Sequence, residues 1–251
     1  MESLYINNNK LKILLDFINE LVNLRTLSFK FNKITNITNS ISNLKNLKFL
    51  ILSYNFLTNF DSICYIKSLE NLNLEFNQIL EIPSNIDNLE NLRSLKLLNN
   101  NISFIPKALS KCMKLYRLCL SNNLIVNFNY ICNIKSLEYL NLEFNQILEI
   151  PSNINNLENL KSIKLTCNKI SILPEKLSEC RKLKTLSLSN NLISNFNFIC
   201  KIISLQNLDL DHNQILNIPD LIGNLENLED LDLSYNRISI FSENLFKCRK
   251  L

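Results

Sequence analysis

The chain has 251 residues and a net charge of +4, from 27 basic and 23 acidic side chains. Because the two signs nearly balance, the composition argues against a strongly basic nucleic-acid-binding protein and predicts no attraction to a membrane surface. Hydrophobic residues make up 46% of the chain, enough for a packed core. No apolar run approaches the roughly 18 residues of a transmembrane helix, and the start, MESLYINNNK, lacks the features of a signal peptide.

One phrase, Leu-x-x-Leu-x-Leu-x-x-Asn-x-Ile/Leu, returns every 22 or 23 residues along the whole chain. Such a period predicts a solenoid, because a single unit cannot bury its own apolar side and must stack on its neighbours. One asparagine marks each unit, and we expect its side-chain amide to bond the backbone of its own and the adjacent coil, which makes a ladder. These ladder asparagines are Asn9, Asn32, Asn55, Asn77, Asn100, Asn123, Asn145, Asn168, Asn191, Asn213 and Asn236.

Within each unit the predicted elements follow in a fixed order. The two-residue step between Leu72 and Leu74 predicts a short strand with both leucines on its inner side, stacked in parallel on the strands of neighbouring units. After the turn at Asn77, apolar residues recur at three- and four-residue steps, which predicts a helical or 3₁₀ return segment. Prolines suit the start of that segment because their φ is fixed and they lack an N–H. They occur at Pro83, Pro106, Pro151, Pro174 and Pro219.

The order of the 22- and 23-residue intervals itself repeats every 68 residues, which indicates that a block of three units was duplicated. The blocks cover residues 1–67, 68–135, 136–203 and, in part, 204–251. No linker or low-complexity segment separates them. We therefore predict a single domain, residues 1–251, of about 11 repeats.

Strings such as LENLNLEFNQI (69–79), LEYLNLEFNQI (137–147) and LEDLDLSYNRI (228–238) resemble the leucine-rich repeat family. The resemblance implies an α/β solenoid, a horseshoe or arc with parallel β-strands on the concave face and helical or 3₁₀ return segments on the convex face. Units with a proline are similar to intracellular repeats of Ras-associated scaffolds and their plant relatives. The 22-residue units, such as NLIVNFNYICNIKSL (123–137), are similar to those of a phosphatase-regulatory subunit. Both subtypes imply a cytosolic or nuclear protein that binds rather than catalyses.

Residues that catalysis or metal binding would need are scarce. The only histidine is His212 and the only glycine is Gly223, so neither a nucleophile–histidine site nor a Gly-rich phosphate loop is predicted. Of the eight cysteines, Cys64, Cys132 and Cys200 recur only every third unit, which is too far for a disulfide or a zinc site. We interpret the cysteines as small buried side chains, and the sequence predicts no enzyme activity, no cofactor and no metal.

The predicted concave face supplies the candidate binding residues. Aspartates gather on the last two strands, where they should attract a basic segment, and aromatic side chains, joined by one histidine, can anchor a protein ligand. The candidates are Phe49, Tyr54, Phe76, Tyr139, Phe144, Asp209, Asp211, His212, Asp230, Asp232 and Tyr235. Two structural alternatives stay open. The residue before each ladder asparagine could shield the turn without contacting a ligand, and the acidic strands could face solvent without binding a partner.

We therefore predict an intracellular, cytoplasmic interaction scaffold that binds a protein partner through the concave face, and neither nucleic acid nor membrane. One alternative is a regulatory module of an enzyme complex, in phosphatase or small-GTPase signalling. Another is a secreted or surface recognition protein, which would need an export signal and glycans at Asn36 or Asn101. Because Met1 and Leu251 both occupy leucine slots of a unit, we also expect uncovered apolar ends that favour end-to-end self-association or continuation in a longer chain.

Overall fold

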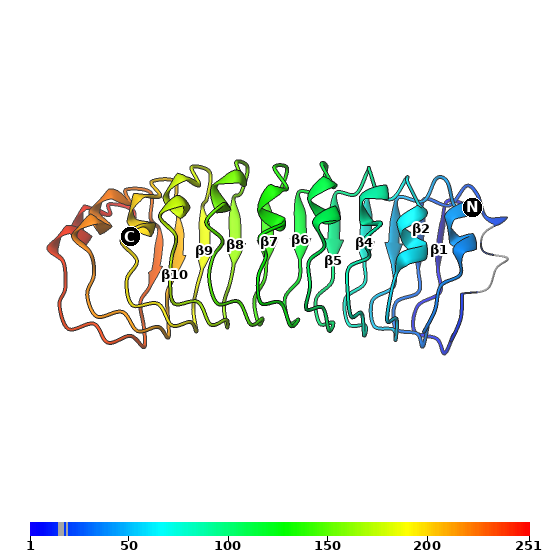
Figure 1. Ribbon diagram of the computed structural model, residues 1–251, viewed down its shortest axis with the longest axis horizontal. Coiled ribbons are helices and arrows are strands. Elements are labelled where there is room, and N and C mark those ends of the chain that lie inside the picture. Colours follow the sequence, from blue (N-terminus) through cyan, green and yellow to red (C-terminus); the bar gives the residue numbers. More distant parts are fainter. Residues whose placement is uncertain (15–17, 19) are drawn as a thin grey trace. The chain divides into compact units, whose positions relative to one another are not determined.

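The structure, a computed structural model, describes residues 1–14, 18 and 20–251. Contacts within the chain divide it into two compact units, Met1–Leu124 (unit 1) and Ile125–Leu251 (unit 2). Each unit is a stack of coils (Figure 1). The prediction of a single domain over residues 1–251 stays a prediction.

Every coil contributes one strand of three residues, and within each unit consecutive strands pair in parallel and in register, for example Leu72 beside Leu50 and Leu95. The strands are short because the middle residue is the one that faces the core, and the chain leaves the strand at the following turn. Unit 1 contains β1 Ser3–Tyr5, β2 Thr26–Ser28, β3 Phe49–Ile51, β4 Asn71–Asn73, β5 Ser94–Lys96 and β6 Arg117–Cys119. Unit 2 contains β7 Tyr139–Asn141, β8 Ser162–Lys164, β9 Thr185–Ser187, β10 Asn207–Asp209 and β11 Asp230–Asp232.

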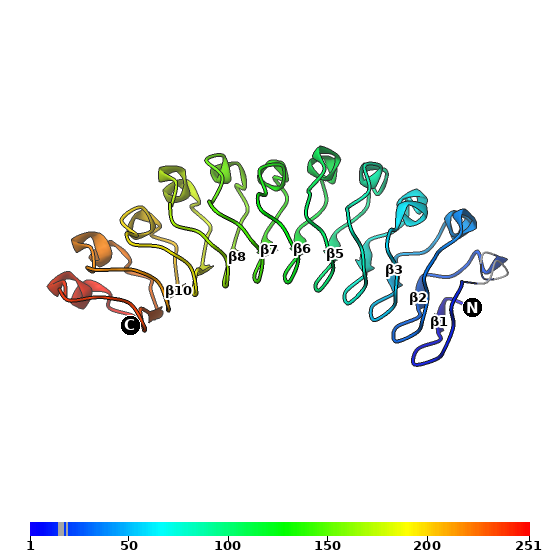
Figure 2. The ribbon, with the colours of Figure 1, turned by 60° about the horizontal axis from the view of Figure 1, so that its bottom comes forward.

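The return segments are short 3₁₀ helices, which lie on the side of the coils opposite the strands in both units (Figure 2). Those of unit 1 are η2 Asn39–Asn43, η3 Asp61–Tyr65, η4 Ile86–Asn88 and η5 Lys107–Lys111. Those of unit 2 are η6 Ile131–Asn133, η7 Ile154–Asn156, η8 Glu175–Glu179, η9 Ile199–Lys201, η10 Asp220–Asn224 and η11 Glu243–Lys247. The predicted solenoid of parallel strands and 3₁₀ return segments is confirmed in each unit.

The prolines open these return segments as predicted. Pro106, Pro174 and Pro219 have φ angles of −74°, −72° and −64° and directly precede η5, η8 and η10. The carbonyls of Pro83 and Pro151 accept hydrogen bonds from Ile86 and Ile154, three residues on. A proline there loses no hydrogen bond, since its missing N–H would lack a partner at a helix start.

Three coils of 22 residues omit the proline and bury a larger side chain instead. Phe60, Phe128 and Phe196 lie five residues after their ladder asparagines and are at most 1% exposed. The same place in the 23-residue coils holds Ile82, Ile105 or another aliphatic residue. A larger ring therefore fills the core where the coil has one residue fewer, which keeps the packing dense.

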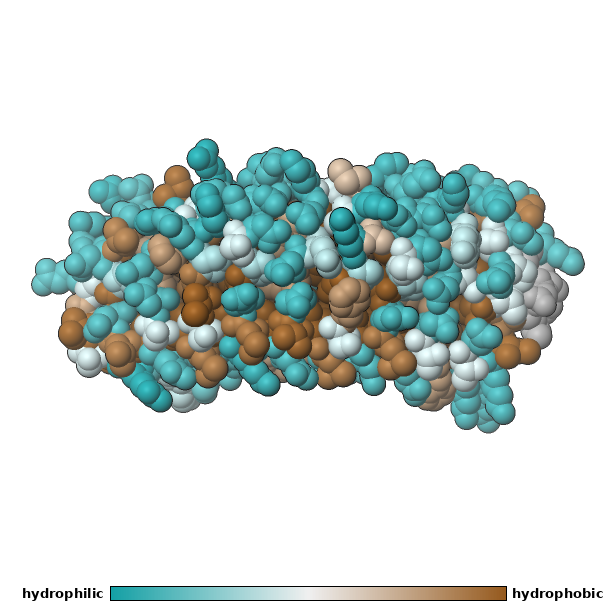
Figure 3. Space-filling model, in the orientation of Figure 1, coloured by the Kyte–Doolittle hydropathy of each residue, from teal (hydrophilic) through white to brown (hydrophobic). Residues whose placement is uncertain are grey.

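The outer surface of the coils is mostly hydrophilic, with hydrophobic side chains gathered in a band below the 3₁₀ helices (Figure 3). The segments that lead from the ladder asparagines to the 3₁₀ helices carry exposed apolar side chains, among them Leu148, Ile172 and Leu216 in unit 2. No helix among the described residues has the length and apolar character that a membrane crossing requires.

Candidate functional site

The accessible residues of the strand side alternate with core residues. In β4, Leu72 is buried while Asn71 and Asn73 on either side of it are half-exposed. We define the strand face of a unit by three residues in each coil. These are the first and third residues of the strand and the residue two positions after the third. These side chains lie on the side of the strand opposite the core leucines, because side chains alternate along a strand, although serines among them, such as Ser53, are buried.

The ladder asparagines hold the turns that end the strands. The side-chain amide of Asn77 donates to the carbonyls of Leu74, in its own coil, and Leu52, in the preceding coil, both at 3.0 Å. Its Oδ1 accepts from the Leu57 backbone N–H at 3.0 Å. The same set of bonds recurs at Asn100, Asn123 and Asn191. The bonds satisfy buried backbone groups that the turn would otherwise leave unpaired.

The residue before each ladder asparagine has a left-handed backbone conformation. All eleven of these residues, which we call the turn column, have φ between 49° and 58°. Asn tolerates this region, whereas a bulky side chain there is strained. The turn column therefore has a structural role, and it includes the candidates Tyr54, Phe76, Phe144, His212 and Tyr235.

Aromatic members of the turn column stack where they follow one another in adjacent coils. In unit 1, the ring centroid of Tyr54 lies 4.2 Å from those of Phe31 and Phe76. The Nζ of Lys30 lies 4.9 Å from the Phe31 centroid and 5.5 Å from that of Tyr54, close enough for a cation–π interaction. Lys30 and Phe31 are not among the candidates predicted from the sequence. Phe31 could have been identified from its position directly before the ladder residue Asn32.

A small hollow lies on the strand face of unit 1, with a volume of about 150 Å³. Phe49, which is 41% exposed, and Ile51 form its apolar side, and Lys96 of β5 lies at the other side. Asn71, Asn73 and Ser94 complete the polar lining. Among the sequence-predicted residues only Phe49 belongs to this hollow, since Tyr54 and Phe76 lie in the turn column.

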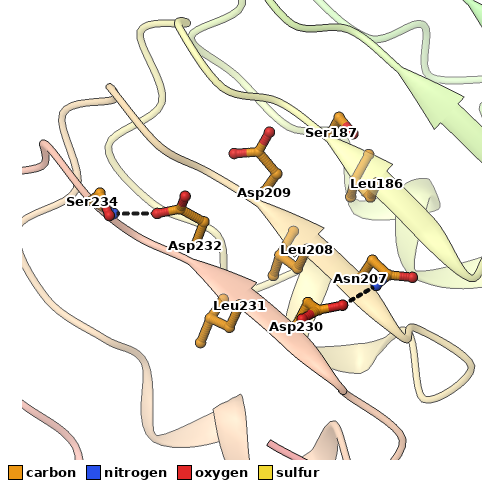
Figure 4. A pocket seen from close by; sticks show the side chains of 9 residues that line it. All are labelled: Leu186, Ser187, Asn207, Leu208, Asp209, Asp230, Leu231, Asp232 and Ser234. Atoms are coloured by element: carbon orange, nitrogen blue, oxygen red, sulfur yellow. Dashed lines mark hydrogen bonds between the residues drawn. The ribbon is translucent and has the colours of Figure 1, made fainter.

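A larger hollow, of about 560 Å³, lies on the strand face of unit 2 and contains three of the four predicted aspartates. Asp209 and Asp232 lie at the ends of β10 and β11, and Asp230 lies at the start of β11 (Figure 4). Asn207 donates to Asp230 at 2.6 Å. No lysine or arginine pairs with these three carboxylates among the described residues, so their charge is available to a ligand.

Short local hydrogen bonds orient the acidic side chains. The backbone N–H of Ser234 donates to Oδ1 of Asp232 at 2.8 Å, and the side chain and backbone of Ser234 together lower the pKa of Asp232 below its usual value. The backbone N–H of Asp211 donates to Asp209 at 3.2 Å. Asp232 therefore stays ionised at neutral pH and cannot act as a proton donor there.

The remaining candidates lie outside this hollow. Asp211 contacts the ring of His212 through Oδ1 and Nδ1, and His212 stacks on Tyr235 with 4.1 Å between ring centroids. Tyr235 is 77% exposed and Phe144 is 55% exposed. Tyr139 starts β7, at the other end of unit 2 from β11. The candidates thus form separate groups rather than one site.

The buried cysteines are protected by their surroundings. Six of the eight are buried, whereas Cys119 and Cys167 are partly exposed. Cys112 occupies the position at the end of its 3₁₀ helix that Leu89 holds in the preceding coil. Burial raises the pKa of the Cys112 and Cys132 thiols to about 12, so the reactive thiolate is rare at neutral pH. Within the described part of the chain, no group of three or more metal-ligating side chains could hold a metal ion.

Comparison with known proteins agrees with this geometry. Residues 135–193 and 203–251 match a family model described as leucine rich repeat, and residues 68–89 match a second model with the same description. No curated protein matches the chain.

Solved structures resemble the whole chain. A leucine-rich repeat protein of Leptospira interrogans is 32% identical, with a TM-score of 0.97, over 100% of this chain and 65% of that one. The ectodomain of the membrane receptor kinase GASSHO1/SCHENGEN3 of Arabidopsis thaliana, in complex with CASPARIAN STRIP INTEGRITY FACTOR 2, is 27% identical (TM-score 0.81; 100% and 35%). An internalin of Listeria monocytogenes is 25% identical (TM-score 0.67; 100% and 85%).

The chain thus spans 65% of the Leptospira protein's length and 35% of the plant ectodomain's. The repeat phrase, the ladder asparagines, the stacked parallel strands and these matches agree with one another. The chain belongs to the leucine-rich repeat proteins.

Proposed function

We propose that this protein is a non-catalytic scaffold that binds a protein partner through its strand faces. The observation that carries the proposal is the hollow of unit 2, where Asp209, Asp230 and Asp232 share one open surface with no basic partner among the described residues. Aligned carboxylates of this kind attract a basic segment and speed its encounter with the surface. Their place on paired strands fixes their positions, which lowers the entropy cost of binding.

The likeness to a receptor ectodomain whose structure contains a bound factor supports binding as the activity of the fold. A fold alone does not define a partner, so the partner is proposed from the charge of the hollow, as a protein with a lysine- or arginine-rich segment. The exposed Phe144 and Tyr235 of the turn column are proposed as additional contacts, because aromatic side chains make strong anchors for a protein ligand.

We propose that the protein works inside the cell, in the cytoplasm. All eight cysteines are free thiols, a pattern that suits a reducing compartment. The finer similarity to the Ras-associated and phosphatase-regulatory subtypes suggests a role in signalling, in which the scaffold would regulate an enzyme.

A second candidate function is recognition at the cell surface, which the likeness to a membrane-receptor ectodomain favours. Asn36 and Asn101 are exposed, so a glycan could be attached to either. Mass spectrometry of the protein from its native cells separates the two candidates. Unmodified Asn36 and Asn101 with reduced thiols support the cytoplasmic protein, and glycans at either position support the surface protein.

End-to-end self-association is proposed as a further contact, because Phe241 and Phe246 in the coil of η11 are 59% and 82% exposed and exposed apolar groups favour association. Sedimentation of the wild type beside a Phe241→Ser, Phe246→Ser variant tests this contact. A concentration-dependent oligomer lost in the variant supports it, and a monomer at all concentrations refutes it.

The test of the main proposal is an affinity capture from native lysate with three forms of the chain. The first is wild type, and the second carries Asp209→Asn, Asp230→Asn and Asp232→Asn. The third is a matched control that loses the same charge away from the strand face, with Glu90→Gln, Glu158→Gln and Glu226→Gln, all at exposed positions. A partner held by wild type and control but lost by the aspartate variant supports the proposal. A partner held equally by all three refutes it.

A further inference from the structure

The strand faces of the two units carry opposite charge. That of unit 1 carries three basic residues and one acidic residue, namely Lys30, Lys96, Arg117 and Glu75. That of unit 2 carries one basic and five acidic residues, namely Lys164, Glu143, Asp209, Asp211, Asp230 and Asp232. A basic segment suited to unit 2 is therefore repelled by unit 1, whose ligand must have a different chemistry.

On the strand face of unit 1, the described side chains leave the charge of Lys96 unpaired. Elsewhere, neighbouring coils neutralise one another, as where Glu70 lies 2.9 Å from the Nζ of Lys48 and 3.5 Å from the Nε of Arg93. Lys96 is flanked in the sheet by Asn73 and Cys119, which are uncharged. Asn73 is itself occupied, because it donates to Glu75 at 3.1 Å. No carboxylate pairs with Lys96 among the described residues.

The apolar side of the same hollow is supplied by Phe49 and Ile51 on β3. Phe49 is 41% exposed, and no other ring stacks on it in the part of the chain that the structure describes. The hollow thus offers an open aromatic and aliphatic wall on β3 and a free ammonium group on β5, with only neutral polar side chains between them. An apolar group and a carboxylate on one ligand would satisfy both sides.

We propose that the strand face of unit 1 binds an extended acidic segment of a protein partner, with an apolar side chain against Phe49 and Ile51 and an aspartate or glutamate on Lys96. The inference rests on the proposed function and names the ligand chemistry of a second surface. Adjacent strands are about 4.8 Å apart, so β3 and β5 are about 10 Å apart. Alternate residues on one side of an extended segment lie about 6.6 Å apart. The long Lys96 side chain spans the difference between this spacing and the separation of β3 and β5. The expected signature is therefore an apolar residue two positions from an acidic one.

Selection from a display library of random ten-residue peptides tests this signature on the intact chain. Wild type is compared with Lys96→Glu, with Phe49→Ser and with the control Lys114→Glu. The control makes the same charge change at an exposed lysine whose Nζ donates only to Asn91. Circular dichroism establishes that each variant is folded.

We expect wild type and Lys114→Glu to enrich peptides with the apolar-x-acidic signature. Lys96→Glu should instead enrich peptides with lysine or arginine at the acidic position, and Phe49→Ser should bind the wild-type peptides about tenfold more weakly, as for loss of an anchor residue. The same enriched peptides on Lys96→Glu and Lys114→Glu would overturn the inference. Enrichment of basic peptides alone, lost when Asp209, Asp230 and Asp232 are changed to Asn, would also overturn it and leave the proposed function standing. If wild type enriches no peptide, the unit 1 site is refuted, and the lysate capture decides the proposed function separately.

Discussion

Replacing Asn77 by alanine should test how far the ladder asparagines stabilise the coils. The substitution removes the acceptor of the buried Leu57 N–H and three side-chain donations, to the carbonyls of Leu52, Leu74 and Glu75. Those three carbonyls keep a second donor, because Leu52 also accepts from Asn55, Leu74 from Asn100 and Glu75 from the Tyr54 N–H. The main cost is therefore the unpaired N–H.

An unpaired buried donor costs about 1–3 kcal/mol and each lost hydrogen bond about 0.5–1.5 kcal/mol. With the three carbonyls still partly satisfied, we expect Asn77→Ala to lower the free energy of unfolding by about 2–4 kcal/mol. Asn9 provides a matched control, because it is exposed and its amide donates only to Asn7. Asn9→Ala should cost less than about 1 kcal/mol.

Urea unfolding followed by far-ultraviolet circular dichroism measures both variants against wild type. Because each coil contacts only its neighbours, the loss at Asn77 acts on the coils of unit 1 that adjoin it. Equal destabilisation by Asn77→Ala and Asn9→Ala would mean that the side-chain bonds to buried backbone groups contribute nothing to stability, contrary to this prediction.

Three further predictions concern single side chains. Phe144 has a φ of 53° and no stacked ring among the described residues, so Phe144→Asn should stabilise the chain by about 1 kcal/mol by relieving backbone strain. Tyr54→Asn should stabilise the chain less, or destabilise it, because it breaks two ring stacks. Thermal unfolding measures both variants, and an equal gain in stability would contradict this prediction. The buried Ser53 hydroxyl has no hydrogen-bond partner among the described residues, while Ser189 in the equivalent place donates to Thr166 at 3.1 Å. Ser53→Ala should therefore be neutral or stabilising, and Ser189→Ala should cost about 1 kcal/mol in urea unfolding. A larger loss of stability in Ser53→Ala than in Ser189→Ala would contradict this prediction. Iodoacetamide at pH 8 should modify the partly exposed Cys119 and Cys167 before the six buried cysteines. Mass spectrometry after treatment of the native protein measures the order of modification. Early modification of Cys132 would contradict its burial and raised pKa.

Periodicity predicts most of the fold here because each coil obeys the same local constraint. The step from Leu72 to Leu74 and the recurring Asn77 determine which side chains are buried and where the strand ends. The side chain five residues after a ladder asparagine is phenylalanine in the 22-residue coils and aliphatic in the 23-residue coils. These are properties of one coil and its nearest neighbours, so the sequence contains them.

The candidate sites were less predictable, because they depend on contacts across coils. The sequence placed Asp209, Asp230 and Asp232 on adjacent strands, but the separate pairing of Asp211 with His212 depends on side-chain orientation. The left-handed conformation of Tyr54 and Phe76 was not predicted, since aromatic residues are uncommon there. The unpaired charge of Lys96 and the hollow beside Phe49 could not be predicted, because they depend on which side chains lie next to one another in neighbouring coils.

Carboxyl footprinting of the complex captured from lysate shows whether the partner binds at the acidic strand face of unit 2. Carbodiimide labelling, read by mass spectrometry, compares each acidic side chain in the free and the bound protein. We predict that Asp209, Asp230 and Asp232 are protected in the complex, while Glu90, Glu158 and Glu226 away from the strand face label as in the free protein. Protection of the three glutamates with unchanged labelling of the three aspartates would contradict this prediction.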